Sequence, residues 1–338
     1  MDWTRGYTSL FEVHRMNVDS WAPYQKVKDV QSFAISRTCD ETVPLLETAT
    51  MEIDDAFEDG WYQLSMIVDQ GSVERQNLGV FLFEKSGTKY DYNRTTTTAS
   101  GYSVLKPADD RLVVHGLYAL KGSNGAEQAA LMLRECTPAP VVVHGKFDLA
   151  ANLVFDVGMT YLAAVWLLLD AGGFCIQISG DGTINIMPKP IEASIELSRY
   201  NAELLLPGVQ DDQTVINVPN RYYAIDGDRY AVAVNNNPTS IASYISRGRW
   251  VDAIDNSPAM VNGESLQEYA ERKLKEATTI TKKVTYSREY YPGVVPFSLV
   301  SGSMPEIGLD GYMMVITQSL TCDKGVYVQE TAAQAVKL

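Results

Sequence analysis

Five carboxylates lie close together in the segment MEIDDAFEDGW: Glu52, Asp54, Asp55, Glu58 and Asp59. Glycoside hydrolases cleave their substrate between two carboxyl groups, of which one acts as an acid. In a strand, Glu52 and Asp54 would share one face, and Trp61 nearby could provide a stacking surface for a sugar ring. A charged strand end beside a turn explains the same residues without catalysis, and we favour that second interpretation.

Other groups with catalytic chemistry lack the necessary spacing. The chain has three histidines: His14, His115 and His144. They show none of the short spacings of zinc sites, no serine lies in GxSxG, and no glycine-rich segment matches a phosphate-binding loop. Asp181, Asp226 and Asp228 lie beside glycines and are interpreted as turn residues, not as calcium ligands. The sequence therefore predicts no catalytic, cofactor-binding or metal-ligating residue, no cofactor and no enzymatic activity.

The charge of the chain disfavours nucleic acid as its main partner. Among 338 residues, Asp and Glu number 42 and Lys and Arg number 28, so the net charge is −14. A protein that neutralises phosphates needs a basic surface, so we expect no sequence-specific nucleic-acid binding and no attraction to anionic membranes. The longest apolar run, Tyr161 to Leu169, is much shorter than the about 20 residues that span a bilayer, so no stable membrane insertion is expected.

The cysteines and the first residues indicate a reducing compartment. The four cysteines are scattered without a CxxC pair: Cys39, Cys136, Cys175 and Cys322. Buried thiols are the expected state. The first residues contain no charged segment followed by an apolar one, so no secretory signal is expected.

The elements that would position these residues are mainly strands. In the first third, apolar runs that end at glycines predict strands at 62–71 and 78–87. In the middle, an apolar segment predicts a buried helix over 158–171, and a hairpin follows at 174–188 with its turn at Gly180-Asp181-Gly182. In the last third, two alternating runs flank the turn at 226–228. A charged helix over 264–278 begins with a capping box of Ser265 and Glu268, and GYMMVITQSLTC and GVYVQETA predict two closing strands.

These elements indicate an α+β protein that is mainly β. We divide it into an N-terminal β-rich domain (1–140), a small α+β unit (141–205) and a C-terminal β-rich domain (206–338) with the inserted helix.

Several segments, in chain order, resemble the phage tail hub family, which comprises relatives of late control protein D and of the central hub of contractile-tail baseplates. In 32–86, a lightly charged strand precedes a GW strand and an LGxFL strand. In 159–190, an apolar helix and a glycine stop precede a DGxIxIxP hairpin, and 215–255 contains NPxS, GR and VDxID. SLQEYAERKLKEA resembles the helix that follows, and 291–322 resembles the strand that returns to the sheet.

The resemblance implies a structural protein of the virion tail tip, assembled in the cytoplasm of the bacterial host of a phage or prophage. It implies two β-barrel-like domains with a helix–hairpin unit between them, so that the segment Pro219 to Arg249 would form barrel wall. Three copies would form a ring that joins the hexameric tail tube to the tip spike or fibre, next to distal tail or baseplate proteins. DNA would pass through the lumen of this homotrimer, and an acidic lumen would repel its phosphates.

Two other interpretations remain open. One is a β-rich phage module that binds a host saccharide through Trp21, Trp61 and Tyr92. The other is a cell-wall glycan hydrolase that uses the acidic cluster around Asp54.

Overall fold

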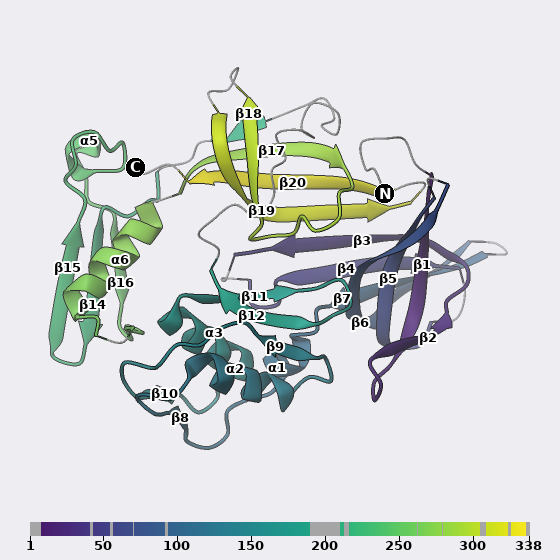
Figure 1. The fold of residues 1–338 in the computed structure, drawn as a ribbon, viewed down its shortest axis with the longest axis horizontal. Coiled ribbons are helices and arrows are strands. Elements are labelled where there is room, and N and C mark those ends of the chain that lie inside the picture. Colours follow the sequence, from purple (N-terminus) through teal and green to yellow (C-terminus); the bar gives the residue numbers. More distant parts are fainter. Residues whose placement is uncertain are drawn as a thin grey trace.

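The computed structural model describes residues 8–40, 43–54, 57–69, 71–91, 94–189, 210–212, 216–261, 263–278, 280–304, 309–323 and 326–335. Figure 1 shows three parts: a large β-sheet, a group of helices with a short hairpin, and a small sheet covered by one helix. No helix within these ranges is long and apolar enough to cross a membrane.

Strands from both ends of the chain form one large sheet of twelve strands. The first seven are β1 (Thr8–Asn17), β2 (Ala22–Lys26), β3 (Val30–Thr38), β4 (Glu47–Ile53), β5 (Gly60–Asp69), β6 (Val73–Asp91) and β7 (Arg94–Tyr102). The other five are β13 (Gln210–Asp212), β17 (Ile280–Glu289), β18 (Leu299–Met304), β19 (Leu309–Cys322) and β20 (Val326–Ala335). The order is β13-β17-β20-β19-β3-β4-β7-β6-β5-β1-β2, and β18 pairs with β19.

The antiparallel pairing of β3 with β19 joins the two halves of this sheet, with Ser36 opposite Ser319. Residues alternate between two faces along each strand: on β4 every second residue is buried and the others are exposed. The buried face of β3 and β4 carries Phe33, Ile35, Met51 and other apolar side chains, and their core also contains Leu320 of β19. The N-terminal and C-terminal strands therefore share a core as well as a ladder.

The helical part covers a second core. It contains α1 (Lys106–Asp110), α2 (Gly125–Arg134) and α3 (Tyr161–Gly172), with the strands β8 (Leu117–Ala119), β9 (Val141–Val143), β10 (Leu153–Phe155), β11 (Phe174–Ile178) and β12 (Ile184–Pro188). Thr160 caps α3, since its hydroxyl accepts from the N–H of Ala163, and Gly173 ends the helix in the left-handed conformation that glycine adopts most easily. The core of this part also includes Trp61 and Val80 of the large sheet, which fixes the helices to it.

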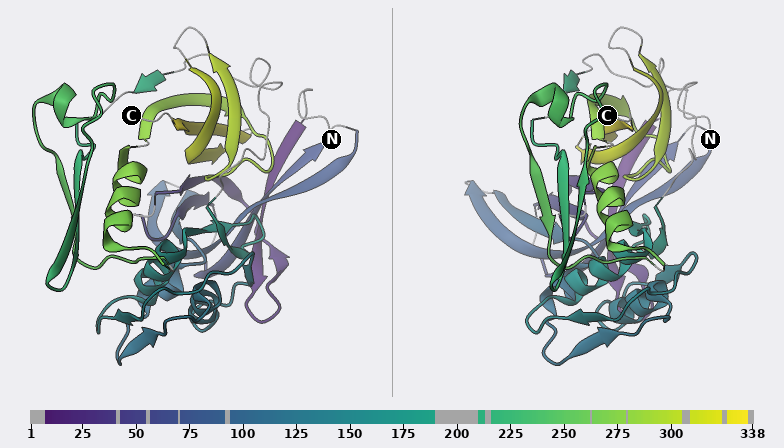
Figure 2. Two further views of the ribbon diagram at one scale, coloured as in Figure 1. Left: turned by 60° about the vertical axis from the view of Figure 1, so that its left-hand side comes forward. Right: turned by 90° about the vertical axis from the view of Figure 1, so that its left-hand side faces the viewer.

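The small sheet has the order β15-β14-β16 and lies to one side of the large sheet (Figures 1 and 2). Its strands are β14 (Arg221–Asp226), β15 (Arg229–Val234) and β16 (Asp252–Asp255), and two helices accompany it, α5 (Tyr244–Arg247) and α6 (Leu266–Thr278). α6 packs on one face through Tyr269, Ala270 and Leu274. At its start, Glu268 accepts from the N–H of Ser265 (2.8 Å) and Ser265 accepts from the N–H of Glu268 (3.3 Å).

The predicted mainly β, α+β class is confirmed, and so are the helix after residue 158, the hairpin at 174–188 and the capped helix near 264–278. The prediction of closed, barrel-like domains is wrong for the described strands, because the path from β13 to β2 is open. The segment 219–249 is also not barrel wall, since β14 and β15 pair with each other and with β16 and not with the large sheet. α2 was not predicted. The division at residues 140 and 205 stays a prediction.

Candidate functional site

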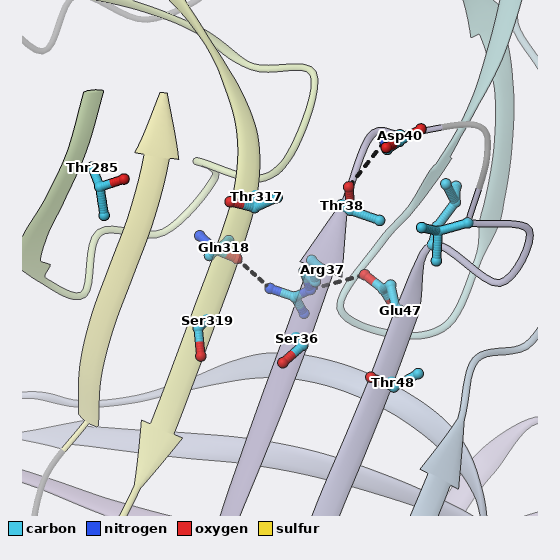
Figure 3. A pocket seen from close by; sticks show the side chains of 12 residues that line it. Ser36, Arg37, Thr38, Asp40, Glu47, Thr48, Thr285, Thr317, Gln318 and Ser319 are labelled. Atoms are coloured by element: carbon cyan, nitrogen blue, oxygen red, sulfur yellow. Dashed lines mark hydrogen bonds and ion pairs between the residues drawn. The ribbon is translucent and has the colours of Figure 1, made fainter. Parts of the chain in front are cut away.

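Arg37 lies on β3 at the junction of the two halves of the large sheet. Figure 3 shows its guanidinium between Gln318 and Glu47. The Nε donates to Glu47 Oε1 and Nη1 donates to Gln318 Oε1, both at 2.8 Å, and Nη2 donates to the carbonyl of Leu78. Gln318 in turn donates to the carbonyl of Val294 at 2.8 Å. One buried side chain therefore connects β3 with β4, β6 and β19.

This network is desolvated. Arg37, Glu47 and Gln318 are 7%, 6% and 3% exposed. Burial raises the pKa of Glu47 above its ordinary value, and this effect outweighs the opposing influence of Arg37. Its second oxygen, Oε2, has no hydrogen-bond partner among the described residues. A buried ion pair of this kind adds little stability relative to apolar residues, but the loss of one partner is costly.

The opposite face of the same strands carries hydroxyl groups. The register places Ser319, Ser36, Thr48 and Tyr102 in one row across β19, β3, β4 and β7. The next row holds Thr321, Ala34, Thr50 and Ser100. We call these two rows the hydroxyl face. Its eight side chains are uncharged, and the pairing of β19 with β3 adds Ser319 and Thr321 to it.

A cavity of about 520 Å³ lies next to the Arg37 network (Figure 3). Six of its lining residues carry hydroxyl groups: Ser36, Thr38, Thr48, Thr285, Thr317 and Ser319. These groups can donate and accept hydrogen bonds. Within the described ranges, no cluster of three or more His, Cys, Asp or Glu side chains could hold a metal ion.

The described members of the acidic cluster make separate structural contacts. Asp54 accepts from the hydroxyl of Thr96 and Asp59 accepts from the N–H of Lys85, each at 2.9 Å. Glu58 pairs with Arg15, and Glu52 is exposed on β4. Asp55 lies outside the described residues. None of the four described carboxylates lines the cavity beside Arg37, and Asp54, Glu58 and Asp59 hold neighbouring strands and turns.

The aromatic residues predicted for saccharide binding are used in packing. Trp61 is 8% exposed and belongs to the core under the helices. Trp21 meets Trp61 edge to face at 5.4 Å, and its indole N–H donates to the carbonyl of Asp181 at 3.0 Å. Tyr92 lies outside the described residues. The two tryptophans therefore fix the β11–β12 turn to the large sheet and do not form an open stacking surface.

The histidines and turn aspartates lie apart. His144 pairs with Asn185 at 2.9 Å, and His115 is exposed. For His14 of β1, burial lowers the pKa. Asp181 accepts from the N–H of Thr183 within its turn, as the turn interpretation predicts.

Likewise, Asp226 pairs with Arg229 across the β14–β15 turn and Asp228 is exposed. Three cysteines, Cys39, Cys175 and Cys322, are buried, and Cys136 is half-buried.

Sequence reasoning missed the Arg37 network, although a local signal was present. Arg37 continues the buried alternation of Phe33 and Ile35 along β3, and Glu47 starts that of Ala49 along β4. A charged residue in the apolar phase of a strand predicts a buried ion pair, and here each strand supplies one partner.

Comparisons with known proteins agree with this architecture. No protein-family model matches the sequence, and no curated protein matches it. Among solved structures, a tail protein from Neisseria meningitidis superposes with a TM-score of 0.68 at 14% identity, over 98% of this chain and 97% of that one. The 43 kDa tail protein of prophage MuSo2 from Shewanella oneidensis superposes with a TM-score of 0.66 at 13% identity, over 97% of this chain and 99% of that one. The prophage tail protein gp18 from Listeria monocytogenes superposes with a TM-score of 0.55 at 12% identity, over 97% of this chain and 94% of that one.

These similarities extend over nearly the full length of each chain. The protein therefore has the fold of phage and prophage tail proteins, which confirms the resemblance that the sequence segments indicated.

Proposed function

We propose that the protein is a structural hub of a phage or prophage tail tip, in which three copies form a ring between the tail tube and the tip spike or fibre. The observation that carries this proposal is the match of the whole chain, 98% of it, to a tail protein of almost the same extent. Fold alone does not determine function, but the arrangement of the large sheet also suits a ring.

The two-part sheet suits a ring that meets a hexameric tube. Each chain contributes two groups of strands to the large sheet. One group is β1–β7 and the other is β13 with β17–β20, and the two are joined where β3 pairs with β19. Three chains would present six such groups and could match six tube subunits. Repeated head-to-tail contacts generate a closed ring when the rotation between subunits closes. The distal tail or baseplate proteins would surround this ring at the virion tip, and assembly would take place in the bacterial cytoplasm.

The hydroxyl face is our candidate for the surface that lines the ring. Short uncharged hydroxyls at positions such as Thr48 and Ser36 offer no fixed positive charge to phosphates, so DNA would pass without strong binding. With this face toward the lumen, the lumen would be neutral, and not acidic as the net charge alone had led us to expect. The acidic residues would then face outward and keep the assembly soluble.

A catalytic role is not part of the proposal. Asp54, Glu58 and Asp59 hold neighbouring strands and turns, and Trp61 is buried. We therefore place cell-wall cleavage, where the phage needs it, in another tail protein, and expect no cofactor.

The test is the mass of the purified full chain by light scattering over a concentration series. A ring of three 37.4 kDa chains has a mass of about 112 kDa, and we expect that mass at micromolar concentrations. A mass of one chain at every concentration would contradict a preformed ring. Antibody labelling of purified tails is the second test. Label at the tip supports the hub, and absence of the protein from the tails would overturn the proposal.

A further inference from the structure

β15 forms an outer edge of the small sheet, because in the described part of the chain it pairs only with β14. The N–H of Asn235 donates to the carbonyl of Asn220 on the β14 side at 2.8 Å. Backbone groups alternate in direction along an antiparallel strand. The N–H and C=O groups of Tyr230, Val232 and Val234 therefore point to the outer edge. The side chain of Gln267 confirms this direction, since it donates to the carbonyl of Val232 at 3.2 Å.

A groove of about 490 Å³ runs between this edge and α6. Its wall on α6 combines the apolar Leu274 with the polar or charged side chains of Gln267, Glu271, Lys275 and Thr278. The side chains of Ala231 and Ala233 face α6 within the small core, so those of Tyr230 and Val234 lie on the other, open face. Tyr230 is 73% exposed and Val234 is 41% exposed. Apart from the Val232 carbonyl, which Gln267 occupies, the outward backbone groups of this edge have no partner strand in the described part of the chain. The edge has a groove on one side and the side chains of Tyr230 and Val234 on the other.

Two other sheet edges have features that discourage pairing. β2, the last strand of the large sheet, contains Pro23 and Lys26, and both residue types prevent the addition of a strand. β16, the second edge of the small sheet, carries Asp252 and Asp255. β15 contains no proline, no lysine and no acidic residue. It is therefore the least protected of these three edges.

We propose that β15 and the groove beside α6 bind an extended segment of another tail protein by strand addition; this rests on the proposed function. In strand addition the main chain supplies hydrogen bonds and alternate side chains enter a groove. Here residues opposite Ala231 and Ala233 would enter a groove whose wall carries Glu271 and Lys275 as well as Leu274, so the segment needs small or polar residues at every second position. It needs backbone N–H groups at its paired positions, which excludes proline there.

The size of the edge favours a tethered segment over a second copy of this chain. Six residues of strand are about 20 Å long, whereas stable interfaces between globular proteins bury about 1,200–2,000 Å². Such a short ladder suits the end of a neighbouring tail protein that other contacts already hold nearby.

Hydrogen–deuterium exchange on the full chain, alone and in purified tails, tests the proposal. We expect the amides of Tyr230, Val232 and Val234 to exchange at least about tenfold more slowly in tails than in the isolated chain. Unchanged exchange in tails that contain the protein would overturn this inference and leave the hub intact. Tails without the protein would overturn the hub itself. Protection that rises with the concentration of the isolated chain would mean a second copy occupies the edge, against our choice of partner.

Three variants sharpen the result. Val232→Pro removes one outward N–H and should abolish the protection of Tyr230 and Val234 in tails, while Val232→Thr keeps that N–H and should retain it. Gln267→Ala leaves the Val232 carbonyl open to the added strand and should slow exchange in tails a further several-fold. If Val232→Pro does not fold, the Gln267→Ala arm decides, and faster exchange there would refute strand addition.

Discussion

Replacement of Arg37 by methionine should loosen the junction between the two halves of the large sheet. The variant removes the charge that pairs with Glu47 and the donors to Gln318 and Leu78. Glu47 is only 6% exposed, so water cannot replace the lost guanidinium. Loss of one partner from a buried ion pair costs about 3–5 kcal/mol. We expect the free energy for local opening of the β3–β19 ladder to fall by that amount.

A double variant separates the cost of an unpaired buried charge from the cost of changed packing. With Arg37→Met and Glu47→Leu together, no carboxylate stays buried without a partner, and the apolar pair can pack in the same space. Only the Gln318 and Leu78 oxygens then lose a donor, at about 1 kcal/mol each. The double variant should therefore be more stable than Arg37→Met alone by about 2 kcal/mol.

Amide hydrogen exchange is the appropriate assay, because a chain of several parts does not unfold in one two-state step. The amides of β3 and β19 that bond across the junction report its opening directly. A loss of 3 kcal/mol corresponds to exchange about 150-fold faster, whereas amides of β14 and β15 in the separate small sheet should not change and serve as the internal control. Exchange at the junction within about threefold of the unmodified chain would refute this account of Arg37, and so would a double variant less stable than Arg37→Met.

Substitutions at Glu47, Trp61 and Thr48 test further properties of the structure. Burial raises the pKa of Glu47, so its carboxyl contributes stability below its unfolded pKa that is lost as pH rises through the higher folded value. Thermal midpoints should therefore shift in favour of Glu47→Gln as pH rises above the ordinary pKa of a glutamate, and a constant difference would contradict burial as the cause. Trp61→Ala should lower the free energy of local opening, measured by exchange of the β5 amides beside it, by about 3–5 kcal/mol, and a change below about 1 kcal/mol would show that Trp61 is not core. Thr48→Lys, on the exposed hydroxyl face, should change stability by less than about 0.5 kcal/mol but lower phage infectivity through binding of DNA, whereas Thr48→Asn should not; equal infectivity would remove this face from the DNA path.

Local signals in the sequence were sufficient for the local elements. The β11–β12 hairpin follows from alternation around Gly180 and Gly182, and α6 follows from the reciprocal bonds of Ser265 and Glu268. α2 was missed although its signal is of the same kind: the side chain of Asn124 accepts from the first-turn N–H groups of Ala126 and Glu127. Short capped helices can therefore be recovered when each Asn or Ser before an alanine-rich segment is examined as a cap.

The joined sheet could not be predicted in the same way. Alternation along β3 determines which side chains are buried, but it does not determine which strand lies beside it. Arg37 and Gln318 are separated by 281 positions in the sequence, and nothing near either residue specifies the other. The buried guanidinium of Arg37 on β3 requires a partner of opposite charge, but Glu47 on the neighbouring β4 meets that requirement without β19. The pairing with β19 therefore depends on shape and on the shared core, which only the structure shows.

This long-range pairing has a consequence for assembly. The hydroxyl face includes Ser319 and Thr321 of β19 together with Ser36 and Thr48 of β3 and β4, so it is complete only after the C-terminal strands have formed. Closing so long a loop is slow relative to the formation of local hairpins. A partly synthesised chain would expose the edge of β3, with its unpaired backbone groups, and could pair wrongly with another chain. Once β19 is in place, that edge is covered and the Arg37 network is complete. A ring built through this sheet would therefore admit finished chains and exclude unfinished ones, because the same strand pair that completes the face removes the edge that misassembly would use.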